Sequence, residues 1–172
     1  GFGPQGQYLL IDTPDSQASL RLEESISGRL NGLVADGVLT GWQGVSRWVP
    51  SVQRQGQNRA LIAQHLEQPF LAEHRTRLGL SSRGAPGGAE PLILEDLAVP
   101  ESIGSFIMAP GQHLLFLNNL RVTKGIDDLA ASNKSILFVD PAADVSNVLQ
   151  RYRQIASMLL GLAVALGYFL LL

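Results

Sequence analysis

The chain has no cysteine among its 172 residues, and this absence removes several kinds of chemistry at once. Disulfide bonds, zinc–thiolate sites and cysteine nucleophiles are all excluded. Lysine and arginine form no run anywhere, and the formal net charge is −2 at pH 7. Because proteins bind phosphate backbones through clustered basic faces, we expect no nucleic acid partner.

Patterns of catalytic and metal-binding residues are also missing. The sequence holds three histidines and neither an H-E-x-x-H nor a G-x-S-x-G motif. We interpret His65 and His74 as helix-surface residues, and His113 as a residue at the edge of an apolar strand. Adjacent acids such as Glu23–Glu24 point about 100° apart on a helix, so they do not share one site, and we expect solvated faces or helix-start charges. The sequence therefore predicts no enzyme, with no catalytic, cofactor-binding or metal-ligating residue.

What the sequence does contain is an apolar C-terminal segment, residues 155–172, with no charged residue in 18. As a helix it would be roughly 27 Å long, close to the ~30 Å hydrocarbon core of a bilayer. We expect it to begin a transmembrane helix, a buried core helix being the alternative. Ser157, Gly161 and Ala165 share one face, and small residues at this spacing let helices in lipid approach closely. This stripe indicates other membrane helices as partners, from the same protein or an oligomer, unless the spacing is chance.

The rest of the chain alternates between strand and helix patterns. The expected strands are residues 7–12, 40–50, 112–122 and 135–139. Expected helices are one opened by Thr13-Pro14-Asp15 and ended by Asp36-Gly37, one around 126–131, and one capped by Asp140-Pro141 that continues into the apolar segment. A helical stretch over 51–80, broken or kinked at Pro69, and a Gly/Pro-rich linker over 81–91 interrupt this order.

Without that interruption the order is βαβ–βαβ, which predicts an α+β fold of the ferredoxin-like, split βαβ kind. Such a fold has a four-stranded antiparallel sheet with its helices on one face. We expect residues 1–154 to form this extracytoplasmic domain, with a helical insertion over about 51–91, and residues 155–172 to start the membrane helix. The first residues, GFGPQG, do not form a signal peptide, so we expect the chain to begin inside a longer polypeptide.

Aromatic residues make up only 6% of the chain, and three of them suggest a binding surface. Trp42, Trp48 and Phe106 could line a hydrophobic cleft for a lipid or another apolar small molecule. The alternative, which the low aromatic content favours, is that they fill the domain core.

Three segments resemble the porter-type periplasmic domain of RND-superfamily transporters, and within them the predicted exporters of the MMPL branch. They are GWQGVSRWVPSVQRQ (41–55), QHLLFLNNLRV (112–122) and FVDPAADVSNVLQRYRQ (138–154). The resemblance implies a non-enzymatic domain of a proton-driven exporter of lipids or other hydrophobic compounds in the bacterial inner membrane. Residues 1–154 would lie in the periplasm. It also implies acidic residues in membrane helices as proton carriers, and residues 155–172 contain none.

Two other functions remain open at this point. The chain could be a tail-anchored binding or scaffolding module that ends at Leu172. Arg151 and Arg153 flank the apolar segment and would then face the cytoplasm, as the positive-inside rule favours. A membrane-tethered enzyme is the third possibility, although no catalytic constellation supports it.

Overall fold

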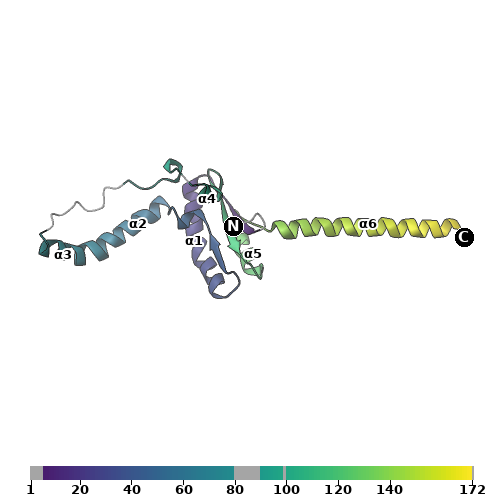
Figure 1. Ribbon diagram of the computed structural model, residues 1–172, viewed down its shortest axis with the longest axis horizontal. Coiled ribbons are helices and arrows are strands. Elements are labelled where there is room, and N and C mark those ends of the chain that lie inside the picture. Colours follow the sequence, from purple (N-terminus) through teal and green to yellow (C-terminus); the bar gives the residue numbers. More distant parts are fainter. Residues whose placement is uncertain (1–5, 80–89, 99, 172) are drawn as a thin grey trace.

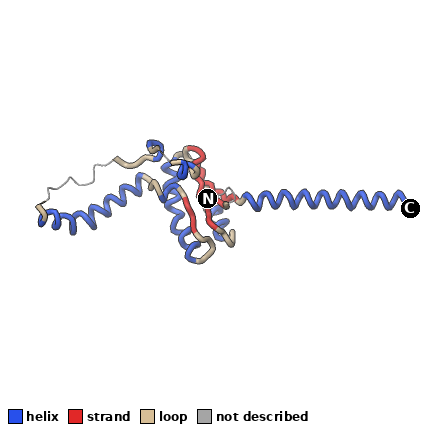
Figure 2. Tube along the Cα trace, viewed as in Figure 1, coloured by secondary structure: helices blue, strands red, loops and turns tan. Residues whose placement is uncertain are grey.

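The computed structural model describes residues 6–79, 90–98 and 100–171, without the side chains of residues 67–70, 72, 75, 102 and 162–171. Its centre is an antiparallel sheet in the order β2-β4-β1-β5, with β3 paired to β4 (Figures 1 and 2). The strands are β1 (Gln7–Asp12), β2 (Gly41–Gln43), β3 (Ile107–Ala109), β4 (Gln112–Asn118) and β5 (Ile136–Val139). The predicted class, α and β elements around an antiparallel sheet, is confirmed.

The helices fall into those that pack on this sheet and those that leave it. They are α1 (Ser16–Ala35), η1 (Val45–Arg47), α2 (Val52–Ile62), η2 (Ala63–Leu71), α3 (Ala72–Arg77), η4 (Leu94–Asp96), α4 (Glu101–Gly104), α5 (Lys124–Ala131) and α6 (Pro141–Leu171). Helix α1 joins β1 to β2, and α5 joins β4 to β5. Figure 1 shows α2 and α3 projecting from one side of the sheet domain and α6 from the other.

Alternation along the strands decides which face of the sheet is buried. In β4 the side chains of residues 113, 115 and 117 are buried and those between them are only partly so. The buried face packs against α1 and α5 in one core. Its fully or nearly fully buried members are Leu9, Ile11, Ile26, Leu30, Leu39, Trp42, Leu115, Leu117, Ile126, Leu129 and Ile136. Burial of these apolar side chains, at about 25 cal/mol per Å², is the main stabilisation of the domain.

The start of α1 lies later than the sequence predicts. Asp15, not Thr13, is the N-cap, and its Oδ1 accepts a hydrogen bond of 2.7 Å from the backbone N–H of Ala18. Thr13 does not cap the helix, because its backbone N–H and its hydroxyl both donate hydrogen bonds to the carbonyl of Gly111. The predicted end at Asp36-Gly37 is confirmed, with Gly37 at φ +70°, where glycine is favoured.

The predicted strand over residues 40–50 is too long. Strand β2 ends at Gln43 and the chain turns into η1, because the backbone N–H of Ser46 is bonded to a side chain of α1 instead of a neighbouring strand. The predicted strand 112–122 likewise ends at Asn118, before Asn119 with φ +51°. Few non-glycine residues have a positive φ, and such a residue ends a strand.

The helical insertion contains two shorter α-helices, as predicted for a break or kink at Pro69, although the chain stays helical between them. Helices α2 and α3 are joined by η2, a π-helical segment that contains Pro69. A wider π turn is one of the known ways in which a helix passes an irregular position. Most of the predicted linker over residues 81–91 lies outside the described residues, and from residue 90 onward the chain lies beside α2. Gln55 there exchanges hydrogen bonds of 2.8 and 2.9 Å with the backbone of Leu92.

Helix α6 follows β5 with one residue between them and continues without interruption for 31 residues, as predicted. Asp140, the residue between, accepts hydrogen bonds from the Gln7 side chain at 2.6 Å and from the Ala143 N–H at 3.0 Å. These bonds, that from Gln7 first, hold the pKa of Asp140 below its ordinary value. The cap therefore stabilises the fold above the unfolded-state pKa, and this stabilisation is lost as pH falls through the depressed value.

Within the part of the chain that the structure describes, no helix combines the length and the apolar character that crossing a membrane requires.

Candidate functional site

The three aromatic residues expected to line a cleft do not come together. Trp42 is 4% exposed and belongs to the core beneath α1. Phe106 is also 4% exposed but packs edge-on against Phe116 in a second cluster. Trp48 is 60% exposed. The core interpretation therefore fits Trp42 and Phe106.

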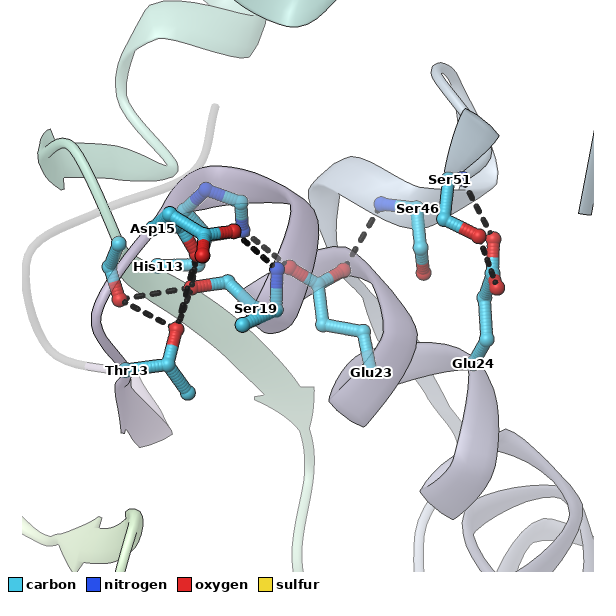
Figure 3. A network of polar contacts seen from close by, with 10 residues as sticks. Thr13, Asp15, Ser19, Glu23, Glu24, Ser46, Ser51 and His113 are labelled. Atoms are coloured by element: carbon cyan, nitrogen blue, oxygen red, sulfur yellow. Dashed lines mark hydrogen bonds and ion pairs between the residues drawn. The ribbon is translucent and has the colours of Figure 1, made fainter. Parts of the chain in front are cut away.

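The main polar feature of the domain is a buried pair that connects α1 to β4. Nδ1 of His113 lies 2.6 Å from Oε1 of Glu23, and both side chains are 0% exposed (Figure 3). This hydrogen bond requires one proton between the two atoms. Either Nδ1 of His113 or the Glu23 carboxyl group carries it, since an ionised carboxylate oxygen can only accept. Nε2 of His113 is buried and has no hydrogen-bond partner among the described residues.

Both members of this pair were interpreted wrongly from the sequence. Glu23 is not solvated, and His113 is fully buried in β4, a strand that lies between β1 on one side and β2 and β3 on the other. A signal was present in each case. Glu23 stands three residues from Leu20 and Ile26 on the buried stripe of α1. His113 is in phase with the buried Leu115 and Leu117 of β4. Two polar residues at core positions have to satisfy each other, because burying either alone is costly.

The second carboxylate oxygen of Glu23 fixes the turn that follows β2. Oε2 accepts a hydrogen bond of 2.8 Å from the backbone N–H of Ser46 in η1. Gly44 makes room for it, since a Cβ there would lie 2.8 Å from Oε2 and 3.0 Å from Cγ of Leu115. The buried pair therefore holds η1 against α1.

Glu24, the neighbouring acid, fixes the start of the helical insertion. Its Oε1 accepts from the backbone N–H of Ser51 at 2.7 Å and its Oε2 from the Ser51 hydroxyl at 2.8 Å. Ser51 is in turn the N-cap of α2. Figure 3 shows the two acids pointing to different anchors, Glu23 to Ser46 and Glu24 to Ser51. Adjacent acids on α1 thus position η1 and α2 separately.

Between these anchored elements lies an open cleft of about 530 Å³, walled by α1, η1 and the start of α2. Its lining is mainly polar. It includes Glu24 and Asn31 from α1, Trp42 from β2, Arg47 from η1, and Arg54 and Asn58 from α2. A volume in the range of about 300–1,000 Å³ is typical of small-molecule sites. The candidate functional site is this cleft, which the sequence did not predict.

The small-residue stripe of the apolar segment is described only in part. Ser157 and Gly161 lie on α6, where the Ser157 hydroxyl donates to the carbonyl of Arg153 at 2.8 Å. A Cβ on Gly161 would meet nothing within 4 Å. The side chain of Ala165 lies outside the described residues. The described side chains from residue 155 to 161 are all exposed.

The described residues contain no group of three or more histidine, cysteine or acidic side chains that could hold a metal ion. Comparisons with protein-family models, with curated proteins and with solved structures find no match for this chain.

Proposed function

We propose that this chain is a periplasmic domain of a proton-driven exporter of the RND superfamily, MMPL branch, together with the start of one membrane helix. It would be a non-enzymatic part of a transporter for lipids or other hydrophobic compounds in the bacterial inner membrane. The observation that carries the proposal is the uninterrupted helix α6. It leaves the sheet directly after β5 and continues into the uncharged residues 155–172.

The connectivity of the sheet supports the proposal. In the order β2-β4-β1-β5, both β1 and β2 run antiparallel to β4, which lies between them, and α1 joins the two. The second unit, β4-α5-β5, likewise has β1 between its strands. A ferredoxin-like, split βαβ fold, which the resemblance to RND porter domains implies, is expected to have this strand order, and the order therefore supports the proposal. The α2–α3 insertion is an addition to that arrangement.

The membrane part of the proposal rests on the sequence of residues 155–172. At 18 residues without a charge, the segment has nearly the length needed to cross the hydrocarbon core. The first part of α6, by contrast, carries Asp144, Arg151 and Arg153 among its exposed residues. The boundary between a polar and an apolar stretch of one helix is expected where a helix passes from water into lipid.

The alternative function, a tail-anchored binding or scaffolding module, uses the same helix with the opposite orientation. Arg151 and Arg153 favour it, since positive residues near a span tend to remain in the cytoplasm. Large domains translocate largely regardless of such charges, so the two arginines do not decide the question. The two functions differ in the side of the membrane on which the sheet domain lies.

A single introduced cysteine distinguishes them, because the natural chain has none. Asp128 is exposed on α5, far along the chain from the apolar segment, and Asp128→Cys should leave the core intact. We expect a membrane-impermeant maleimide to label this cysteine in intact bacterial spheroplasts in which the natural gene carries the substitution. Labelling that requires permeabilised cells would place the domain in the cytoplasm and contradict the exporter proposal. The unsubstituted chain is the control for background labelling.

A further inference from the structure

We propose that the cleft between α1, η1 and α2 binds a phosphate group through the guanidinium groups of Arg47 and Arg54. The cleft lies on the sheet domain, away from α6, and the inference does not depend on the proposed export function. It rests on three features of the described residues: charges that are left unpaired, a guanidinium that is held in place, and neutral donors beside both.

The first feature is that neither Arg47 nor Arg54 forms an ion pair with a described residue. The ion pairs among the described residues are Arg77–Glu73 and His113–Glu23, and neither includes an arginine of the cleft. The carboxylate in the cleft, Glu24, has both oxygens engaged by Ser51. Glu24 keeps its negative charge, but two arginines against one carboxylate leave the cleft lining with a net positive charge, and neither guanidinium is in an ion pair with a described residue.

The second feature is the position of Arg47. Its guanidinium carbon lies 5.0 Å from the ring centroid of Trp42, and its Nη1 donates to the Trp42 carbonyl at 2.9 Å. Trp42 is itself fixed, because its indole N–H donates to Oδ1 of Asn31 at 2.9 Å. A guanidinium stacked on an aromatic ring and bonded at one nitrogen keeps its other N–H groups free in a defined direction. Little conformational entropy is then lost when an anion binds.

The buried pair described above contributes to this position. Glu23 holds the backbone of Ser46, the residue directly before Arg47, and His113 holds Glu23. The turn that carries Arg47 is thus fixed to the buried interior of the domain through Glu23 and His113.

The third feature is the set of neutral donors. Asn31 accepts the indole N–H through Oδ1, which leaves its amide NH₂ as a donor at the cleft. Asn58 contributes a second side-chain amide from α2. A phosphate group has three or more acceptor oxygens and one to two negative charges. It can use two arginines and two amides together, whereas one carboxylate would satisfy a single guanidinium.

Phosphate in such a cleft could come from a lipid head group or from a free phosphate compound. The probes are therefore inorganic phosphate and dihexanoyl phosphatidic acid, both titrated into the full chain in a non-ionic detergent. In a Trp48→Phe background, Trp42 is the sole tryptophan and reports binding at the cleft. We expect a saturable change in its fluorescence with at least one of the phosphate probes, and none with hexanoate at equal ionic strength.

Calorimetric titration of arginine variants then identifies the charges responsible. Arg54→Ala should weaken phosphate binding about tenfold, and Arg47→Lys, which keeps the charge and loses the planar fork, should weaken it by a similar factor. Arg21→Ala is the matched control. It removes an exposed arginine of α1 that does not line the cleft, and it should change the affinity less than twofold.

Each outcome has one meaning. Tenfold tighter binding of the phosphatidic acid indicates a lipid head group as the source, and equal binding indicates that the phosphate alone is recognised. Both outcomes support the inference if they depend on Arg47 and Arg54. No saturable binding of either phosphate probe, equal binding of hexanoate, or an equal loss in Arg21→Ala would overturn it.

Discussion

Replacing Glu23 with leucine is expected to destabilise the domain by about 3–5 kcal/mol, the usual cost of removing one partner from a buried pair. The substitution removes the partner of Nδ1 of the buried His113 and the acceptor of the partly buried N–H of Ser46. The free energy of unfolding is measured by urea denaturation, followed by circular dichroism. Glu95→Gln, at an exposed position in η4, is the control and should stay within about 0.5 kcal/mol of the natural chain.

The double variant tests whether the two side chains act as a pair. Combining Glu23→Leu with His113→Leu replaces both polar groups by apolar ones, so the combined loss should be smaller than the sum of the two single losses. A Glu23→Leu loss below about 1 kcal/mol, or strictly additive losses, would show that the buried contact contributes little to stability.

Replacing Gly111 with alanine should also be severe, with an expected loss of at least about 3 kcal/mol. Gly111 has φ +82°, a conformation that side chains rarely adopt, and an added Cβ would overlap the carbonyl oxygen of Thr13. Its own carbonyl is a shared acceptor at the start of α1. It accepts from the N–H of Thr13 at 3.0 Å and from the hydroxyl of Ser19 at 2.6 Å. Moving the backbone to relieve the overlap would disturb both bonds.

A substitution at a second glycine is the control, and its expected change in the free energy of unfolding has the opposite sign. Gly32 lies in α1, and a Cβ there would meet nothing within 4 Å. Gly32→Ala should therefore stabilise the domain by up to about 1 kcal/mol, because alanine is the better helix former. Thermal unfolding of the two variants in parallel measures the difference. A Gly111→Ala variant as stable as Gly32→Ala would contradict the described turn.

The order of elements could be predicted because it depends on local patterns. Alternation along residues 112–118 and the glycine at 37 after the α1 stripe each carry their own signal. The predicted ends of helices and strands were less accurate where a residue distant in the sequence forms a hydrogen bond with the residues at that end. Thr13 is held by Gly111, 98 residues away, and this moves the helix cap to Asp15.

The candidate site could not be predicted for the same reason. Glu23 and His113 are 90 residues apart, and neither residue alone shows that the other is its partner. Arg47 and Arg54 form no motif in the sequence. They share a cleft in the folded chain, where Glu23 and Glu24 anchor η1 and α2 separately on α1. The aromatic residues were grouped by type, whereas the fold assigns Trp42 and Phe106 to different clusters.

The proposed function requires that residues 155–172 hold the sheet domain at a membrane. Both core clusters lie within residues 9–129 and 136, so deletion of 155–172 should leave the fold unchanged by circular dichroism. The decisive measurement is sedimentation of the full and the truncated chains with bacterial membranes after alkaline carbonate extraction. We predict that the full chain stays in the membrane pellet and that the truncated chain is released into the supernatant. A truncated chain that remains in the pellet as strongly as the full chain, or a full chain that is extracted, would contradict the claim.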